Sequence, residues 1–211
     1  MSLSMISGCK VVDHSLVKVS VSRLRSRETS LGDFRRALRE LAVIVGVEAS
    51  RDLELRKIHL QTPLAACSGH ELARPLVIIP ILRAGLGMAE ALLQVFPEAR
   101  VGHIGLCCDE DTFAPQSYYF KTPPLADSDI FLVDPMLATG QSAADAVDKL
   151  KAAGAGSLRL LALIGAQPGV ERFTSRHPDV PVFLAALDTE LNNKAYIVPG
   201  LGDAGDRYFG T

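Results

Sequence analysis

The sequence predicts an α/β fold in which a parallel five-stranded sheet is flanked by helices. Short apolar runs recur between residue 76 and residue 187, and helix-like stretches or loops separate them. The first run, Leu76–Leu82, is apolar throughout, as expected of a strand that is buried on both faces. Regular alternation of strand and helix favours right-handed crossovers and a parallel sheet. Arg83 and Asp134 follow two of the strands, at the carboxyl ends where such sheets bind ligands.

The amino-terminal third precedes this alternation and is predicted to contain one helix and one strand. Residues 1–13 carry no interpretable pattern. Ser30 is a candidate N-cap, and apolar residues after it recur at helical spacing until about residue 50. Residues 55–61 alternate imperfectly between apolar and polar side chains, which indicates a strand.

Strand and helix alternate from residue 76 onward. The strands of the parallel sheet are expected at residues 76–82, 100–106, 129–134, 157–164 and 182–187. Helices are expected at residues 88–95, 141–153 and 170–176. Residues 109–127 interrupt the pattern with prolines, aromatic residues and acidic residues. An irregular insertion of this length inside a domain is usually a functional flap or a disordered loop.

The composition favours a globular protein that binds small ligands. The 211 residues fit a single domain, residues 1–211. Hydrophobic residues make up 48% of the chain and the net charge is −2, which lacks the basic surface that nucleic acids and anionic membranes require. Four cysteines without metal-ligand spacing favour a reduced, cytoplasmic protein. The chain shows no spanning apolar run and no leader pattern.

The segment Phe131–Ser142 carries the clearest chemical signal. An apolar run ends at Asp134, small and hydroxyl-bearing residues follow, and a helix-like stretch begins near residue 141. Backbone N–H groups in such a loop and at a helix start form a binding site for a phosphate group. The alternative is an ordinary strand–loop–helix connection in which Asp134 only caps the helix. The spacing favours the phosphate site.

Three segments resemble those of a known enzyme family. Residues 133–142, VDPMLATGQS, resemble the phosphoribosyl-diphosphate (PRPP) loop of the uracil phosphoribosyltransferases. Residues 80–88, PILRAGLGM, resemble the diphosphate-binding loop of that family, and residues 196–210 resemble its uracil-binding segment. The resemblance implies a type I phosphoribosyltransferase-like fold. It also implies a flexible flap at residues 109–127 and a small base-binding hood at residues 188–211.

The resemblance implies transfer of the phosphoribosyl group of PRPP to uracil, which yields UMP and diphosphate. The implied catalytic residues are Asp134, Arg83 and Asp203. The implied PRPP-binding residues are Arg83, Asp134, Met136, Ala138, Thr139, Gly140, Gln141 and Ser142. The implied uracil-binding residues are Tyr196, Ile197, Gly202 and Asp203. Mg²⁺ is expected to bind mainly through the oxygens of PRPP.

Each of these assignments has a structural alternative. Arg83 is either a diphosphate ligand or a surface arginine at the end of a strand. The segment Tyr196–Asp203 is expected to lack regular structure, and it either presents backbone donors and acceptors to uracil or is a structural loop. A pocket that satisfies the hydrogen bonds of uracil should reject cytosine, which has an amine in place of one carbonyl.

Two positions depart from the pattern of the family. Gln141 stands where the family usually has glycine, so a positive φ there would cost roughly 1 kcal/mol, whereas a helical φ would be harmless. Cys107-Cys108 replaces a Tyr-Arg pair whose arginine reaches the diphosphate, and Lys121 is a candidate substitute. Two rivals to the active enzyme therefore stay open. One is a paralogue that works poorly or uses another base, and the other is a PRPP- or nucleotide-binding regulator without catalysis.

The resemblance also bears on assembly. It implies a homodimer or a higher homo-oligomer, for which the apolar stretches Val11-Val12 and Leu16–Val21 are candidate contacts. GTP activates some relatives and is a candidate effector that the sequence leaves open. The five histidines show no metal-ligand spacing and are interpreted as structural or surface residues.

Overall fold

The computed structural model describes residues 6–108 and 115–211, with only the backbone described at residues 107, 108 and 115–117. Its main element is a nine-stranded sheet, seven strands of which form one continuous path. In spatial order these are β1 (Cys9–Val11), β11 (Val182–Asp188), β10 (Ser157–Ala166), β8 (Asp129–Val133), β4 (Leu76–Leu82), β6 (His103–Cys108) and β7 (Pro115–Lys121). The short strands β5 (Arg100–Val101) and β9 (Met136–Leu137) pair with β4 and β10.

The five predicted strands are all present and run parallel to one another. They correspond to β4, β5 with β6, β8, β10 and β11. In the register of β8, Val133 lies beside Pro80 of β4 and Leu161 of β10. The residues that follow β4 and β8 therefore lie next to each other, at the carboxyl ends of these parallel strands.

Two further strands extend the sheet at its edges. At one edge β1, which is three residues long, pairs in parallel with β11. At the other edge β7 pairs antiparallel with β6 and lies wholly within residues 109–127, which were predicted as an irregular flap. The strand β1 was not predicted because three residues are too few to show a pattern. In β7, Pro115 is tolerated because it is the first residue of an edge strand. Residues 109–114 of the predicted flap lie outside the described part of the chain.

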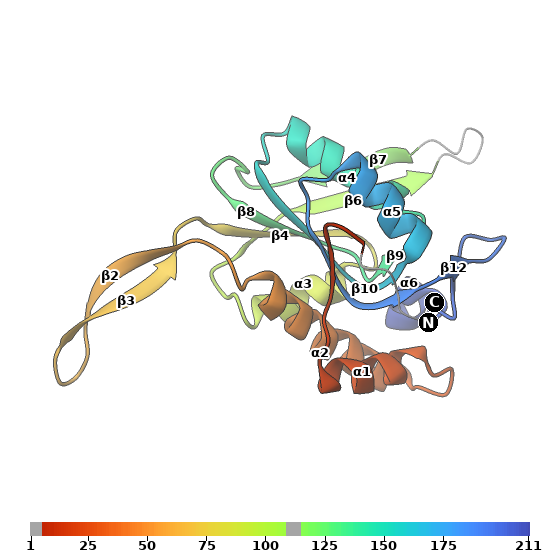
Figure 1. Cartoon of the computed structure of the whole chain (residues 1–211), viewed down its shortest axis with the longest axis horizontal. Coiled ribbons are helices and arrows are strands. Elements are labelled where there is room, and N and C mark those ends of the chain that lie inside the picture. Colours follow the sequence, from red (N-terminus) through yellow and green to blue (C-terminus); the bar gives the residue numbers. More distant parts are fainter. Residues whose placement is uncertain (1–5, 109–114) are drawn as a thin grey trace.

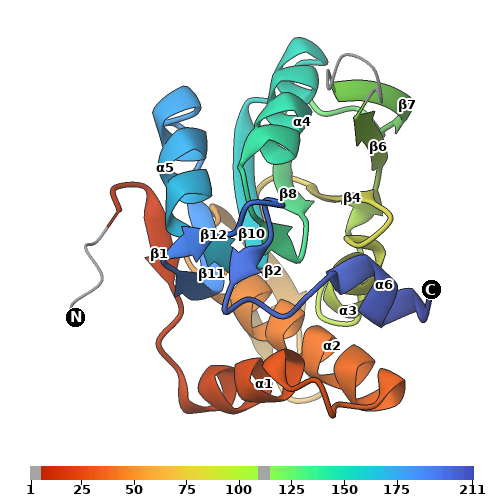
Figure 2. The same cartoon turned by 90° about the vertical axis from the view of Figure 1, so that its right-hand side faces the viewer.

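Helices cover both faces of the sheet (Figures 1 and 2). On one face lie α1 (Ser15–Arg25), α2 (Leu31–Ala49) and α3 (Leu86–Leu93), and on the other lie α4 (Gln141–Ala152) and α5 (Gln167–Arg176). The predicted N-cap of α2 is confirmed, since Ser30 Oγ accepts a hydrogen bond of 3.2 Å from Asp33 N.

The hydrophobic core consists of two layers, one on each side of the sheet. Alternate residues of β8 divide between them: Phe131 and Val133 pack with the α1–α3 layer, whereas Ile130 and Leu132 pack with α4 and α5. Every residue of β8 is buried, as expected of a central parallel strand. This double burial fixes the direction in which the chain leaves β8 at Asp134.

A two-stranded arm projects from the body of the molecule (Figure 1). It consists of β2 (Leu55–Gln61), which was predicted, and β3 (Ala66–Leu72), which was not. The segment of β3, ACSGHEL, lacks the apolar alternation that marks a strand. At the tip of the arm, Leu64 is 95% exposed.

The carboxyl-terminal segment is more regular than expected. It contains the antiparallel pair β12 (Glu190–Leu191) and β13 (Ile197–Val198), followed by α6 (Ala204–Phe209). Asp203 caps α6, because its Oδ1 accepts a hydrogen bond of 2.9 Å from Asp206 N. These elements are two to six residues long, which is too short for periodicity to reveal them.

Candidate active site

A cavity of about 350 Å³ opens beside the carboxyl end of β8, where the loop after this strand faces the carboxyl-terminal segment. Its lining residues come from three stretches of the chain: Ala84, Asp134, Met136, Ala138, Lys194, Ala195, Tyr196, Gly202, Asp203, Ala204 and Gly205. Six of the predicted site residues are among them: Asp134, Met136, Ala138, Tyr196, Gly202 and Asp203. The fold thus brings together two motifs that are about sixty residues apart in sequence.

The loop before α4 has the backbone geometry that a phosphate site needs. Gly140 has a φ of +78° and precedes the helix, while Gln141 is its first residue and is not among the residues with positive φ. The glutamine is therefore harmless to the backbone, which decides between the two alternatives left open by the sequence. The N-cap residue Gly140 has no side chain, and the N–H of Gln141 donates a long hydrogen bond of 3.4 Å to Thr139 Oγ1. The N–H groups that follow in the first turn of α4 suit an anion.

The same loop packs directly against the first turn of α5. A Cβ atom built on Gly169 would lie 1.9 Å from the carbonyl oxygen of Ala138. A Cβ atom on Gly140 would lie 2.4 Å from the carbonyl oxygen of Gly169. The backbone of the loop and that of α5 therefore lie too close together for a side chain at Gly140 or Gly169. This close packing lets α5 set the position of the loop.

Asp134 is the less exposed of the two carboxylates that line the cavity. Its backbone N–H donates to Leu161 O at 3.2 Å, and its Oδ1 accepts a hydrogen bond of 3.4 Å from Met136 N. Burial raises the pKa of Asp134 to about 7. The hydrogen bond from Met136 N lowers the pKa, and the negative charge of Asp203 raises it further. This carboxyl group therefore changes charge near neutral pH.

Four more of the predicted residues belong to the loop before α4 and its first turn and do not line the cavity. Thr139, Gly140, Gln141 and Ser142 continue the chain from Ala138 into α4.

Two of the predicted residues lie beyond this loop. Arg83 is exposed after β4, and its guanidinium lies 5.4 Å from the centre of the Phe209 ring. The side chain of Ile197 is 4% exposed and packs in the core, which leaves only its backbone to face a ligand.

Two residues that the sequence did not single out line the cavity beside Tyr196. Among the lining residues Lys194 is the cationic one, and Ala195 has a φ of +61°, a conformation that L-residues rarely adopt. Asn192 holds this turn, since its Oδ1 accepts hydrogen bonds from Lys194 N at 2.9 Å and Tyr196 N at 3.0 Å. The pair Asn192-Asn193 is a turn signal that would have predicted this local structure.

A buried ion pair fixes the carboxyl-terminal segment to α1. Arg25 donates to both carboxylate oxygens of Asp188, at 2.8 and 2.6 Å, and to Gly200 O at 2.9 Å. Asp188 in turn accepts a hydrogen bond of 3.0 Å from Gly200 N. Arg207 adds a second attachment, because its guanidinium donates hydrogen bonds to Leu24 O at 2.5 Å and to Ser26 O at 2.6 Å, at the end of α1. No sequence pattern connects Arg25 with Asp188, which lies 163 positions away.

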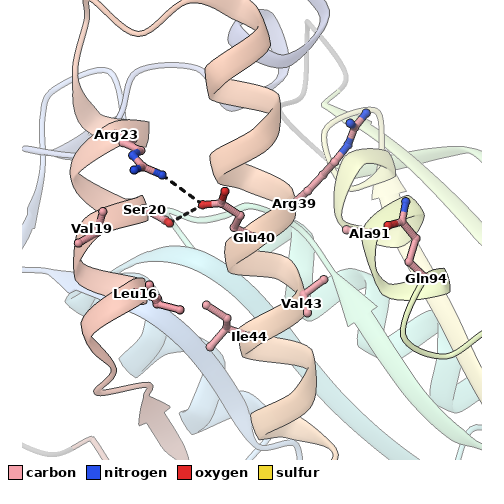
Figure 3. A pocket seen from close by; sticks show the side chains of 10 residues that line it. All are labelled: Leu16, Val19, Ser20, Arg23, Arg39, Glu40, Val43, Ile44, Ala91 and Gln94. Atoms are coloured by element: carbon pink, nitrogen blue, oxygen red, sulfur yellow. Dashed lines mark hydrogen bonds and ion pairs between the residues drawn. The ribbon is translucent and has the colours of Figure 1, made fainter.

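A larger cavity of about 570 Å³ lies between α1, α2 and α3 (Figure 3). It is mainly apolar and has one polar corner, where Glu40 accepts a hydrogen bond of 2.8 Å from Ser20 and pairs with Arg23 at 3.6 Å. Leu16 and Val19, from a stretch predicted to contact a second subunit, are exposed along it. None of the residues that line this cavity is a glycine, and none of them belongs to a phosphate loop like that before α4, so we assign the chemistry to the smaller cavity.

The replacement of the Tyr-Arg pair of the family by Cys107-Cys108 is known from the sequence alone. Cys107 and Cys108 belong to β6, but their side chains lie outside the described part of the structure. Lys121 is exposed at the end of β7 and does not line the cavity.

Residues 6–108 and 115–211 show neither a membrane-spanning helix nor a cluster of metal-ligating side chains. In these residues no helix combines the length and the apolarity needed to cross a bilayer. The same residues contain no group of three or more His, Cys, Asp or Glu side chains arranged to hold a metal ion.

Comparison with known proteins gives a consistent result. The model of the uracil phosphoribosyltransferase family matches residues 11–211. A uracil phosphoribosyltransferase of Mesorhizobium japonicum is 50% identical over 208 residues, which cover 98% of this chain and 100% of the relative. One from Streptococcus equi subsp. zooepidemicus is 49% identical over 205 residues and covers 96% of this chain and 98% of its own.

Solved structures agree with these relatives. The AQ2163 protein from Aquifex aeolicus is 33% identical, covers 96% of this chain and 98% of its own, and superposes with a TM-score of 0.91. A hypoxanthine-guanine phosphoribosyltransferase from Bacillus anthracis is only 12% identical but shares the fold, with a TM-score of 0.53 over 75% of this chain and 80% of its own. From the full-length match to the family model and the near-complete coverage of the relatives, we conclude that the chain belongs to the uracil phosphoribosyltransferase family.

Proposed function

We propose that the protein transfers the phosphoribosyl group of PRPP to uracil, giving UMP and diphosphate. The observation that carries the proposal is that Asp134, Tyr196, Gly202 and Asp203 line one cavity, beside a loop that leads into the start of α4. The 5′-phosphate would bind at the loop, the ribose at Asp134 and the base against the carboxyl-terminal segment. Relatives at about half identity carry the name of this activity.

The reaction is a displacement at the anomeric carbon of ribose, in which positive charge develops on the ring and negative charge on the departing diphosphate. Placement and electrostatics therefore matter more than proton transfer. Ionised Asp134 would accept hydrogen bonds from the ribose hydroxyls and stand near the developing positive charge. Arg83 is proposed to hold the diphosphate, because a guanidinium offers several donors to its oxygens.

The remaining site residues are proposed to bind substrate in two groups. Backbone N–H groups from Ala138 to Ser142 would hold the 5′-phosphate, with the hydroxyl of Thr139 as a further donor. The backbone at Ile197 and Gly202 would pair with the edge of uracil, and Tyr196 would line the base pocket. We further propose that residues 188–211 act as the hood of one domain spanning residues 1–211.

Mg²⁺ fits this site as a companion of PRPP. Mg²⁺ in such enzymes is held by one or two carboxylates and by the oxygens of the substrate. Asp134 and Asp203 supply carboxylates at the cavity, whereas the described residues contain no cluster for a metal cage. When bound, the ion would neutralise negative charge on the diphosphate. Asp134 would hold the ribose, and Asp203 would keep the first turn of α6 in place.

The first experiment is UMP formation from uracil, PRPP and Mg²⁺, with cytosine as the control base. We expect turnover with uracil and none with cytosine. Turnover with cytosine at a similar rate would contradict the proposed base pocket. If the protein binds PRPP without forming UMP, the enzymatic proposal fails and the regulatory alternative takes its place.

The second candidate function, a regulator with weak or no catalysis, is favoured by one observation. Cys107-Cys108 stands where related enzymes carry an arginine that reaches the diphosphate. A charge-assisted hydrogen bond of this kind contributes about 1.5–3 kcal/mol. Cys108→Arg should then raise turnover about tenfold or more if the missing cation limits the reaction. An unchanged rate in this variant would show that the chain supplies the charge from elsewhere, and Lys121→Ala would test its candidate source.

We also propose a homodimer or a higher homo-oligomer, with GTP as a candidate effector. The exposed apolar side chains Leu16 and Val19 support a subunit contact on α1. Light scattering of the purified protein, with Leu16→Glu as the disrupting variant, tests the assembly. A rate measured with and without GTP tests the effector, and equal rates would remove it from the proposal.

A further inference from the structure

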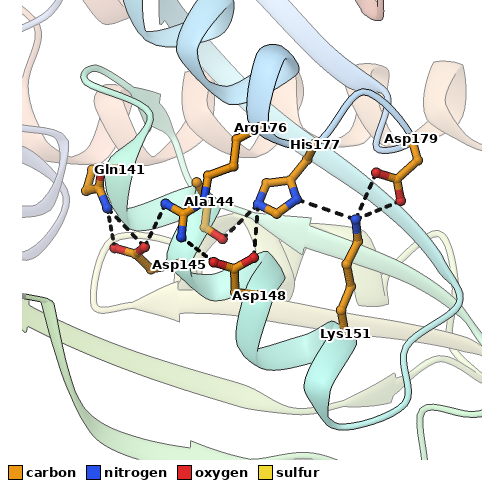
Figure 4. A network of polar contacts seen from close by, with 8 residues as sticks. All are labelled: Gln141, Ala144, Asp145, Asp148, Lys151, Arg176, His177 and Asp179. Atoms are coloured by element: carbon orange, nitrogen blue, oxygen red, sulfur yellow. Dashed lines mark hydrogen bonds and ion pairs between the residues drawn. The ribbon is translucent and has the colours of Figure 1, made fainter.

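The helices α4 and α5 are joined by a chain of charged contacts, which we call the α4–α5 clasp (Figure 4). Its members are Asp145, Asp148, Lys151, Arg176, His177 and Asp179. Arg176 Nη1 lies 3.0 Å from Asp145 Oδ1, and its second terminal nitrogen pairs with Asp148. Lys151 pairs with Asp179 at 2.7 Å. His177 is 3% exposed, and its Nε2 lies 3.1 Å from Ala144 O.

The clasp reaches the phosphate loop through Gln141. The side-chain Nε2 of Gln141 donates to both oxygens of Asp145, at 3.0 and 2.9 Å. Asp145 lies one helical turn farther from the loop, so the glutamine side chain runs along α4, and Figure 4 shows its amide directed at the carboxylate. The side-chain amide of Gln141 therefore stays away from the start of the helix, where the phosphate is proposed to bind.

The carboxylate of Asp145 is poorly placed for a phosphate site. The Cα atom of Asp145 lies about 6 Å along the helix axis from that of Gln141, the first residue of α4. The side chain of Asp145 is only 12% exposed, so solvent screens it weakly. Alone, this negative charge would oppose the attraction of the helix start for a phosphate group. Arg176 is the cation that pairs with it in the described structure.

We propose that Arg176 is a positioning residue for PRPP, although it does not line the site. It neutralises Asp145 and holds the carboxylate where Gln141 can bind it, so the start of α4 keeps its attraction for the 5′-phosphate. This inference rests on the proposed function, specifically on PRPP binding at this loop. Two unit charges about 8 Å apart at an effective dielectric constant of about 40 change a binding constant roughly five- to tenfold.

The test compares Arg176→Ala with Arg172→Ala. Arg172 lies on the same helix, is exposed and makes no ion pair within the described residues, so the control removes the same charge from the same element. Binding of PRPP and of ribose 5-phosphate is measured by calorimetry, and kcat and both KM values are measured by UMP formation. Arg176→Ala should weaken binding of both phosphorylated ligands about five- to tenfold, while kcat and KM for uracil stay within twofold.

Two further variants separate the charge from the fold. Arg176→Lys should recover most of the affinity, because it restores the positive charge. In the double variant Asp145→Asn with Arg176→Ala, the buried charge nearest the helix start is removed, and the remaining carboxylate of Asp148 is farther along α4 and 48% exposed. PRPP affinity should therefore return to within about twofold of the parent. Equal affinity of Arg176→Ala and Arg172→Ala would overturn the proposal. A loss that the double variant does not recover would overturn it as well, since the role of Arg176 would then be structural.

These outcomes stay distinct from failure of the proposed function. If the unaltered protein does not bind PRPP, the proposed function fails, and the inference fails with it. If it binds PRPP and only the contrast between Arg176 and Arg172 is missing, the proposed function stands and the inference alone is wrong.

Discussion

Replacing Asp134 by asparagine should stabilise the empty protein and weaken PRPP binding at the same time. Burial raises the pKa of this carboxyl from its ordinary value of 3.8 to about 7. The folded protein therefore keeps the proton up to about pH 7, whereas the unfolded chain loses it near pH 4. Between these values the unfolded state binds fewer protons, so the free energy of unfolding falls as pH rises, and above pH 7 the loss is complete.

The size of this effect follows from the pKa shift. Each unit corresponds to 1.36 kcal/mol, which gives an upper limit of about 4 kcal/mol at pH 8. Asp134 remains partly accessible through the cavity. We therefore expect about 2 kcal/mol after solvation of the charge. Asparagine keeps the shape of the side chain and removes the charge, so Asp134→Asn should regain that amount at pH 8 and less at pH 5.

The assay is urea unfolding of both proteins at pH 5 and pH 8, together with calorimetry of PRPP binding. At pH 8 we expect the variant to unfold at higher urea and to bind PRPP at least tenfold more weakly, because the ribose loses a charged acceptor. Asp13→Asn is the control, since its carboxylate is exposed and Lys18 holds its pKa below the ordinary value. If Asp134→Asn and the parent lose stability in parallel from pH 5 to pH 8, the assignment of a buried, proton-sensitive carboxyl is wrong.

Three further substitutions probe how the site is held in place. Gly169→Ala should cost about 3 kcal/mol of stability and raise KM for PRPP at least tenfold, because its Cβ meets Ala138 O at 1.9 Å. Gly156→Ala, with nothing within 4 Å, should change neither. Arg25→Ala should cost about 3 kcal/mol in urea unfolding and raise KM for uracil several-fold, since it leaves Asp188 buried and unpaired. Arg27→Ala, whose ion pair is exposed, should be nearly neutral, and an equal loss in both would contradict the role of Arg25. Ala195→Gly should raise the free energy of unfolding by about 0.5–1 kcal/mol by relieving the positive φ, and a loss would show that the turn is unstrained.

The sequence predicts the central strands well because they are buried on both faces. Each strand of the sheet interior is a nearly continuous apolar run, and such a pattern has few alternatives at that length. The edges escape prediction for the opposite reason. In β1 there are only three residues, and β3 has a polar sequence in an exposed arm, so neither carries a burial pattern.

The candidate site divides in the same way. Asp134 and the loop up to Ser142 are contiguous, so their chemistry is visible in the sequence. Whether Gln141 is strained depended on one backbone angle, which only the structure supplies. The contacts that hold the site, such as Arg25 with Asp188, join residues that no local pattern connects. Lys194 and Ala195 were missed because they stand immediately before the recognised motif, which begins at Tyr196.

The two halves of the site have separate supports, and this separation has a functional consequence. The phosphate loop and α4 are held by α5. At the start of α5, Gly169 packs against the loop, and at its end Arg176 pairs with Asp145 of α4. The segment that would bind the base is held by α1, through Arg25 and Asp188. These supports lie on opposite faces of the sheet and share no residue. Substitutions far apart in the structure should act additively. A variant in the α5 support should therefore raise KM for PRPP, one in the α1 support should raise KM for uracil, and their double variant should show the product of the two changes. Coupling between them would mean that the two halves close on the substrates as one unit.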